Sequence, residues 1–120
     1  MNRRQLPGIF HFISALGYSW RGIRHALRHE DAFRQELAAV VIAAPIGFWL
    51  GDSNIERALL VGSLVPVPMM EMVNTAIETV IDRIGDDHND LSGLAKDLGS
   101  AAVFFSIVLA VVTWSLVLFS

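Results

Sequence analysis

The feature that most constrains this chain is a run near its end, residues 98–119, that contains no Asp, Glu, Lys or Arg. A helix of about 20 apolar residues crosses the hydrocarbon core of a bilayer, which is roughly 30 Å thick. A segment in that core must also bond its own backbone N–H and C=O groups, and a helix does so within itself. We therefore predict a membrane-spanning helix over residues 98–119.

Two further segments are apolar enough to join it, and we predict membrane helices over residues 32–50 and 55–84. Hydrophobic residues make up 53% of the 120-residue chain and its mean hydropathy is +0.50, which is too apolar for an ordinary soluble domain of this size. The length leaves room for one domain. The fold class that follows is an all-α integral membrane protein, with residues 1–120 forming a single membrane-embedded domain.

Residues 7–29 have a different pattern, which predicts an amphipathic helix lying in the membrane surface. Apolar residues recur at intervals of three and four, and polar and basic residues occupy the opposite face. A helix of a soluble core is the alternative for this segment taken alone. The apolar stripe consists of Ile9, Ile13, Leu16, Trp20, Ile23 and Leu27.

The positive charge is concentrated at one end, because six of the nine Lys and Arg residues lie in the first 34 positions. Arg83 and Lys96 flank the loop between the second and third spans, whereas only Arg57 lies near the first loop. The positive-inside rule then places the N-terminus and the 83–97 loop in the cytoplasm. We expect the basic side chains of the surface helix to hold anionic headgroups, and we expect no nucleic-acid partner.

The residues that indicate chemistry are Glu71, Asn74, Glu78 and Asp82, which fall on one stripe of the helix predicted over 55–84. Carboxylates in a membrane helix are unfavourable and usually mark a functional site or an ion path. The stripe leads into a loop of aspartates that includes Lys96. Oxygen ligands without cysteine or a histidine cluster suit Mg²⁺.

Phosphoryl transfer needs such a metal ion, a cation for the phosphates and a positioned base. The carboxylates of the stripe could bind the metal ion and act as the base, and Lys96 could be the cation. The sequence has neither a Walker A motif nor the Gly-rich loop of protein kinases. A proton relay in a small ion-conducting oligomer and a purely structural polar stripe remain alternatives, as does a non-enzymatic membrane adaptor.

Six stretches closely resemble the small trimeric prokaryotic diacylglycerol kinase family. They are GYSW (17–20), AFRQE (32–36), EMVNTAIE (71–78), DRIG (82–85), LSG (91–93) and AKDLGSAA (95–102). The 82–85 and 99–102 stretches look like the Gram-negative, diacylglycerol branch, and an undecaprenol kinase of the same family is the alternative. Two departures are the histidine at position 11, where relatives often have arginine, and the pair Pro66 and Pro68, which we expect to bend the second span.

The resemblance implies an ATP-dependent kinase that converts sn-1,2-diacylglycerol to phosphatidic acid in the bacterial inner membrane, for phospholipid recycling. The family fold is a surface helix plus three membrane helices per subunit, assembled as a homotrimer. The resemblance makes Glu71 the general base, with Glu30 and Glu78 holding Mg²⁺. It implies an ATP site of Tyr18, Glu30, Asn74, Glu78, Asp87, His88, Lys96 and Asp97. It also implies a lipid site of Arg34, Gln35, Glu36, Trp49, Glu71 and Ser100.

Overall fold

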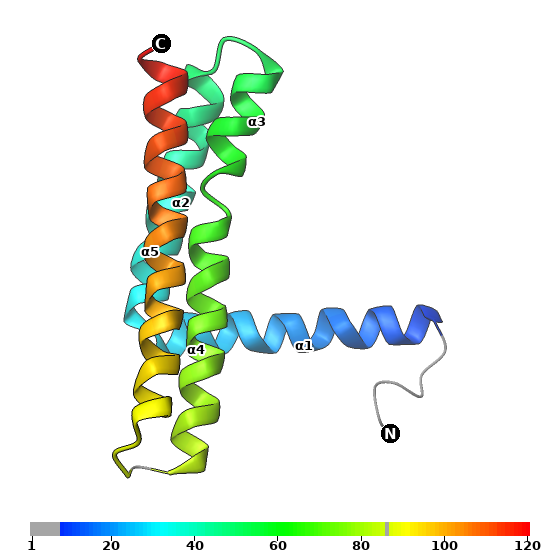
Figure 1. Cartoon of the computed structure of the whole chain (residues 1–120). Helices are drawn as coiled ribbons and strands as arrows, with labels where there is room; N and C mark the ends of the chain where they lie inside the picture. The colour runs from blue at the N-terminus through cyan, green and yellow to red at the C-terminus, as the bar shows by residue number, and fades with distance from the viewer. Residues whose placement is uncertain (1–7, 86) are drawn as a thin grey trace. The chain divides into compact units, whose positions relative to one another are not determined.

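The computed structural model describes residues 8–85 and 87–120, and these residues form helices and turns without any strand. The helices are α1 (Gly8–His29), α2 (Asp31–Leu50), α3 (Asn54–Gly62), α4 (Pro66–Ile84) and α5 (Asp90–Leu118) (Figure 1). The chain divides into two compact units, residues 1–34 and 35–120, and each is described by itself. Pro7 and Asp86, which the sequence placed in the surface helix and the acidic loop, lie outside the described residues.

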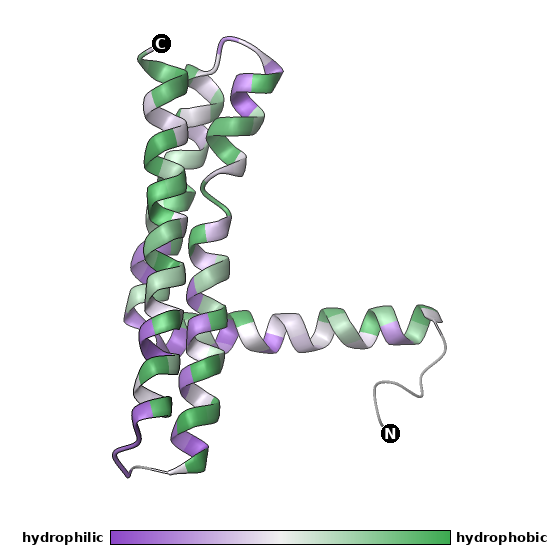
Figure 2. Cartoon of the chain, viewed as in Figure 1, coloured by the Kyte–Doolittle hydropathy of each residue, from purple (hydrophilic) through white to green (hydrophobic). Residues whose placement is uncertain are grey.

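Three helical segments are long and apolar enough to cross a membrane: Asp31–Leu50, Asn54–Ile84 and Asp90–Leu118. Together with the N-terminal helix α1, they confirm the predicted all-α membrane fold class. Hydrophobic residues cover most of α5, whereas hydrophilic residues gather at the end where a short loop joins α4 to α5 (Figure 2).

In the first unit, Arg34 closes the turn between α1 and α2. Its guanidinium donates to the carbonyl oxygen of Leu27 over 3.0 Å and forms an ion pair with Asp31. The backbone N–H of Glu30 bonds to the carbonyl of Ala26 over 3.0 Å, which carries α1 to its end. The sequence predicted a lipid-side role for Arg34, and within its unit the structure gives it this local structural contact.

The second span is interrupted, whereas the sequence predicted one bent helix over 55–84. Residues 63–65 form a turn between α3 and α4. Pro66 and Pro68 have no backbone N–H, so they cannot continue the i to i−4 hydrogen bonding of α3. Leu64 N–H bonds to the carbonyl of Val61, three residues back, over 3.1 Å, and this tighter turn ends α3.

Two side chains bond the carbonyl oxygen of Leu60, which Leu64 N–H would have reached in a continuous helix. The Ser63 hydroxyl donates to it over 3.2 Å, and the indole N–H of Trp114 donates to it over 2.9 Å. Leu60 itself is fully buried, with a relative exposure of 0%. A Cβ atom built on Gly47 of α2 would lie 3.0 Å from the Trp114 ring and 3.1 Å from Leu60 Cβ. Close packing at Gly47 therefore holds α2, α3 and α5 together at this level.

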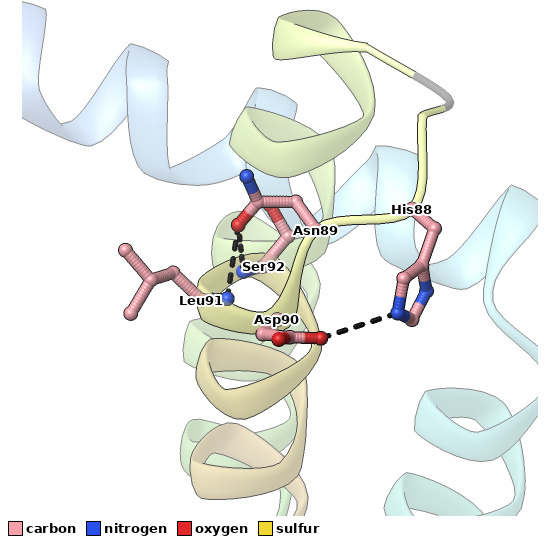
Figure 3. A network of polar contacts seen from close by, with 5 residues as sticks. All are labelled: His88, Asn89, Asp90, Leu91 and Ser92. Atoms are coloured by element: carbon pink, nitrogen blue, oxygen red, sulfur yellow. Dashed lines mark hydrogen bonds and ion pairs between the residues drawn. The ribbon is translucent and has the colours of Figure 1, made fainter.

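Helix starts follow local capping. The Ser53 hydroxyl accepts from Glu56 N–H over 3.2 Å and so caps the start of α3. At the last helix, the Asn89 side chain accepts from the N–H groups of Leu91 and Ser92 over 2.9 and 3.2 Å (Figure 3). Because of this cap, α5 begins at Asp90 rather than at 98.

Candidate active site

The polar stripe of the sequence lies on α4 as predicted. Glu71, Asn74 and Glu78 are half-buried, and Asp82 is exposed one turn further on. The side-chain amide of Asn74 donates to Glu78 Oε1 over 3.4 Å, a pairing that the i, i+4 spacing permits. The amide therefore holds the Glu78 carboxylate on the side of α4 that carries the stripe.

The other end of the Asn74 amide faces α5. Its Oδ1 atom is buried and has no hydrogen-bond partner among the described residues. It lies against Gly99, which is also buried, and a Cβ atom on Gly99 would collide with it. Glycine at this position thus allows α5 to approach Asn74 closely.

Glu71 lies near a second carboxyl group, that of Glu36 on α2. The two side chains are close enough to interact electrostatically. Glu36 Oε2 is buried and, in the part of the chain that the structure describes, accepts no hydrogen bond.

An apolar cavity of about 280 Å³ extends from Glu36 between α2, α4 and α5. Apart from Glu36, its walls are Ala39, Val40, Ala43, Leu64, Val67, Ile107, Ala110 and Val111. The carboxyl pair of Glu36 and Glu71 thus lies where an apolar space meets the polar stripe.

A polar cavity of about 290 Å³ lies at the end of α4 and α5 joined by the loop. Its lining includes Asp87 and His88 from the loop and Lys96 from α5. The Lys96 ammonium pairs with Asp82 of α4 over 3.4 Å, so a cation is held at the wall of this cavity. The His88 ring contacts Asp90 over 3.2 Å (Figure 3).

The remaining predicted site residues lie on α1, α2 and α5 and at the turn between α1 and α2. Asp97 and Ser100 are exposed on α5, and Gln35 is exposed on α2. Trp49 is 80% exposed at the end of α2. Tyr18, Glu30 and Arg34 belong to the first unit, where the Arg21 guanidinium lies 5.3 Å from the centre of the Tyr18 ring.

The model of the family described as "Prokaryotic diacylglycerol kinase" matches residues 17–118 of the chain, which include the stripe, the polar cavity and Gly99. The chain belongs to this family. It is therefore a kinase, and its membrane helices are those of a membrane enzyme.

Relatives named diacylglycerol kinase align over most of their own length. The protein of Escherichia coli (strain K12) is 50% identical over 113 residues, which are 94% of this chain and 93% of the relative. The protein of Haemophilus influenzae is 41% identical over 93% of this chain and 95% of its own. The protein of Pseudomonas aeruginosa is 39% identical over 92% of this chain and 90% of the relative. The resemblance stated from the sequence motifs is confirmed, including its Gram-negative type.

The carboxylates of the site can be compared with the ligands of the metal ion that a kinase of this kind would use. Within residues 8–85 and 87–120, no three His, Asp or Glu side chains converge as a metal site. The Glu78 carboxylate nevertheless offers the hard oxygen donors that Mg²⁺ prefers. Glu30, the other expected ligand, lies in the first unit. The chemistry of the donors therefore fits Mg²⁺, although the second unit alone does not complete a site.

Sequence reasoning missed two contacts in this region. Asp82 was recognised as part of the stripe, but its pairing with Lys96 of the next helix was not predicted. Gly99 was recognised only within a motif, although it determines how closely α5 can approach Asn74. The small residues from 99 to 102 were the available signal, because small side chains mark close helix contacts in membranes.

Proposed function

We propose that the chain transfers the γ-phosphoryl group of ATP to the hydroxyl of sn-1,2-diacylglycerol, giving phosphatidic acid and ADP. One observation carries the proposal: an apolar cavity is lined by Glu36, the partner of Glu71 in the carboxyl pair, and a polar cavity with a lysine lies at the Asp82 end of the stripe. A lipid kinase needs this combination, because its two substrates differ completely in polarity.

In the proposed mechanism, Glu71 acts as general base and accepts the proton of the lipid hydroxyl. The hydroxyl oxygen forms a bond to the γ-phosphorus while the bond from that phosphorus to the β–γ bridging oxygen breaks, and ADP leaves. Glu36 lies beside Glu71 at the end of the apolar cavity, so it contacts the polar head of the same lipid. We place Arg34, Gln35, Trp49 and Ser100 on the lipid side as well.

Lys96 binds the phosphates in this proposal, exchanging its contact with Asp82 for the more highly charged nucleotide. Asp87 and His88 line the same polar cavity and contact ATP there, with Tyr18, Asn74 and Asp97 completing the nucleotide site. Glu30 and Glu78 hold Mg²⁺, which supplies neutralisation of phosphate charge when it is bound. Asn74 supports this by fixing the Glu78 carboxylate.

We further propose that the chain acts as a homotrimer in the bacterial inner membrane, as a single domain with its N-terminus in the cytoplasm. A charged residue facing lipid near the bilayer centre costs on the order of 2.5–3.5 kcal/mol or more. Neighbouring subunits would cover the half-buried stripe, and the small residues of α2 and α5 allow close helix contact. The number three follows the family resemblance, and the orientation follows the arginines before the first span.

The test is transfer of labelled phosphate from ATP by the purified chain in mixed micelles that contain diacylglycerol, undecaprenol or ceramide. We expect Mg²⁺-dependent labelling of diacylglycerol, with Glu71→Gln as the matched inactive control. Equal or faster labelling of undecaprenol would assign the chain to the other branch of the family. Folded protein that labels none of the three lipids would contradict the proposal.

A further inference from the structure

Gly99 is a buried residue of α5 that lies against the Asn74 side chain of α4. An ideal Cβ atom on Gly99 would overlap Asn74 Oδ1, would lie 3.2 Å from Asn74 Cγ and would approach Ile77 Cδ1 at 3.5 Å. The nearest obstacle is therefore the end of a side chain and not the backbone of α4. Adding a methyl group here would displace the Asn74 amide before it displaced the helix.

The orientation of that amide is defined from its other end. A carboxylate can only accept hydrogen bonds, so the group that Asn74 directs toward Glu78 must be its NH₂. The carbonyl end is then directed toward Gly99, where Oδ1 is buried without a hydrogen-bond partner in the described residues. A buried acceptor without a partner is unfavourable, and such groups are rare in native proteins. The close approach at Gly99 accommodates this arrangement by leaving space for the oxygen.

We propose that Gly99 is a positioning residue, which acts through the Asn74 amide to hold the Glu78 carboxylate in the orientation that binds a divalent cation. The inference rests on the proposed role of Glu78 as a metal-binding residue. A side chain at position 99 rotates the Asn74 amide and breaks its hydrogen bond to Glu78. The carboxylate is then free to adopt other rotamers, and its cation affinity falls.

The test is Mn²⁺ binding, measured by electron paramagnetic resonance on the full chain in lipid micelles, with Mg²⁺ dependence of activity as a second readout. Loss of a partner that orients a metal ligand typically lowers metal affinity about 10–100-fold. We expect Gly99→Ala to raise the half-saturating Mn²⁺ concentration about tenfold. At saturating Mg²⁺ we expect kcat to recover most of its original value.

Two other glycines serve as matched controls. Gly62→Ala adds a methyl group that meets no atom within 4 Å beyond its chain neighbours and the backbone of its own helix, so Mn²⁺ binding should not change and stability should not fall. Gly47→Ala adds a methyl group only 3.0 Å from the Trp114 ring, so this substitution should lower thermal stability while leaving Mn²⁺ binding unchanged. A structural defect in helix packing is thereby separated from a defect in the cation site.

Asn74→Ala should weaken Mn²⁺ binding by the same factor as Gly99→Ala, and combining the two substitutions should weaken it no further. The double variant also keeps the test valid if Gly99→Ala alone misfolds, because removing the amide relieves the overlap. Additive effects, or wild-type Mn²⁺ binding by folded Gly99→Ala, would overturn the proposal, as would a Glu78→Gln variant that binds Mn²⁺ normally. If the cation results hold but no lipid is phosphorylated, the proposed function fails and the positioning role of Gly99 stands.

Discussion

The indole N–H of Trp114 donates to the backbone carbonyl of Leu60 over 2.9 Å, joining α5 to the last turn of α3. This carbonyl has lost its helical partner, because the chain leaves the helix before Pro66. An unpaired carbonyl in an apolar environment is unfavourable, so a side chain from another helix replaces the missing donor. Trp114 therefore stabilises the break in the second span.

Trp114→Phe should lower the free energy of unfolding by about 1 kcal/mol, the usual net value of one hydrogen bond. The Ser63 hydroxyl still donates to Leu60 in that variant, so the carbonyl keeps one partner. Adding Ser63→Ala leaves it with neither side-chain donor, and the combined loss should exceed the sum of the two single losses. Reversible unfolding in detergent mixtures measures these values, with the exposed Trp49→Phe as the control; strict additivity would contradict this account.

Glu71→Gln and Glu78→Gln should impair the reaction in different ways. Glu71 is proposed to accept the proton of the lipid hydroxyl, so its amide should lower kcat by about 10²-fold or more while nucleotide still binds. Glu78 is proposed to hold the metal ion, so its amide should also weaken binding of the Mg–nucleotide complex. Nucleotide titrations on both variants distinguish the two roles. Equal binding defects would mean that the roles are wrongly divided.

The proline pair should determine where α4 begins. Replacing both Pro66 and Pro68 by alanine restores two backbone N–H donors, so α3 and α4 should join into one continuous helix. Hydrogen exchange at the amides of residues 63–68 in this variant should then be slower than exchange at Leu64 and Val65 in the parent protein. A continuous helix would change the direction in which the stripe of α4 faces the other helices. Activity should therefore fall even though the helix is more regular. Unchanged exchange and unchanged activity would show that other contacts fix the break.

If the sites form between subunits, two inactive chains should restore activity when they are mixed. Glu71→Gln removes the proposed base, whereas Asp97→Asn changes the proposed nucleotide site. Some mixed trimers would then contain one composite site with neither substitution, and partial activity should return. Crosslinking confirms that the chains co-assemble. If co-assembled chains show no recovery, each site lies within a single chain.

The sequence alone determined the class of fold and the position of the stripe. Membrane helices could be recognised because the bilayer requires long apolar segments whatever the tertiary structure. The common stripe of Glu71, Asn74 and Glu78 also followed from sequence, because the helical period fixes which residues share a face.

Only the tertiary structure decided the contacts between helices. The approach of Gly99 to Asn74, the Trp114 bond to Leu60 and the nearness of Glu36 to Glu71 each join segments far apart in the chain. Such contacts depend on the rotation and axial position of one helix against another, which result from the packing of many side chains together. Residue spacing along one helix does not by itself determine either quantity. The groups of the site could therefore be predicted, whereas the atoms that orient them could not.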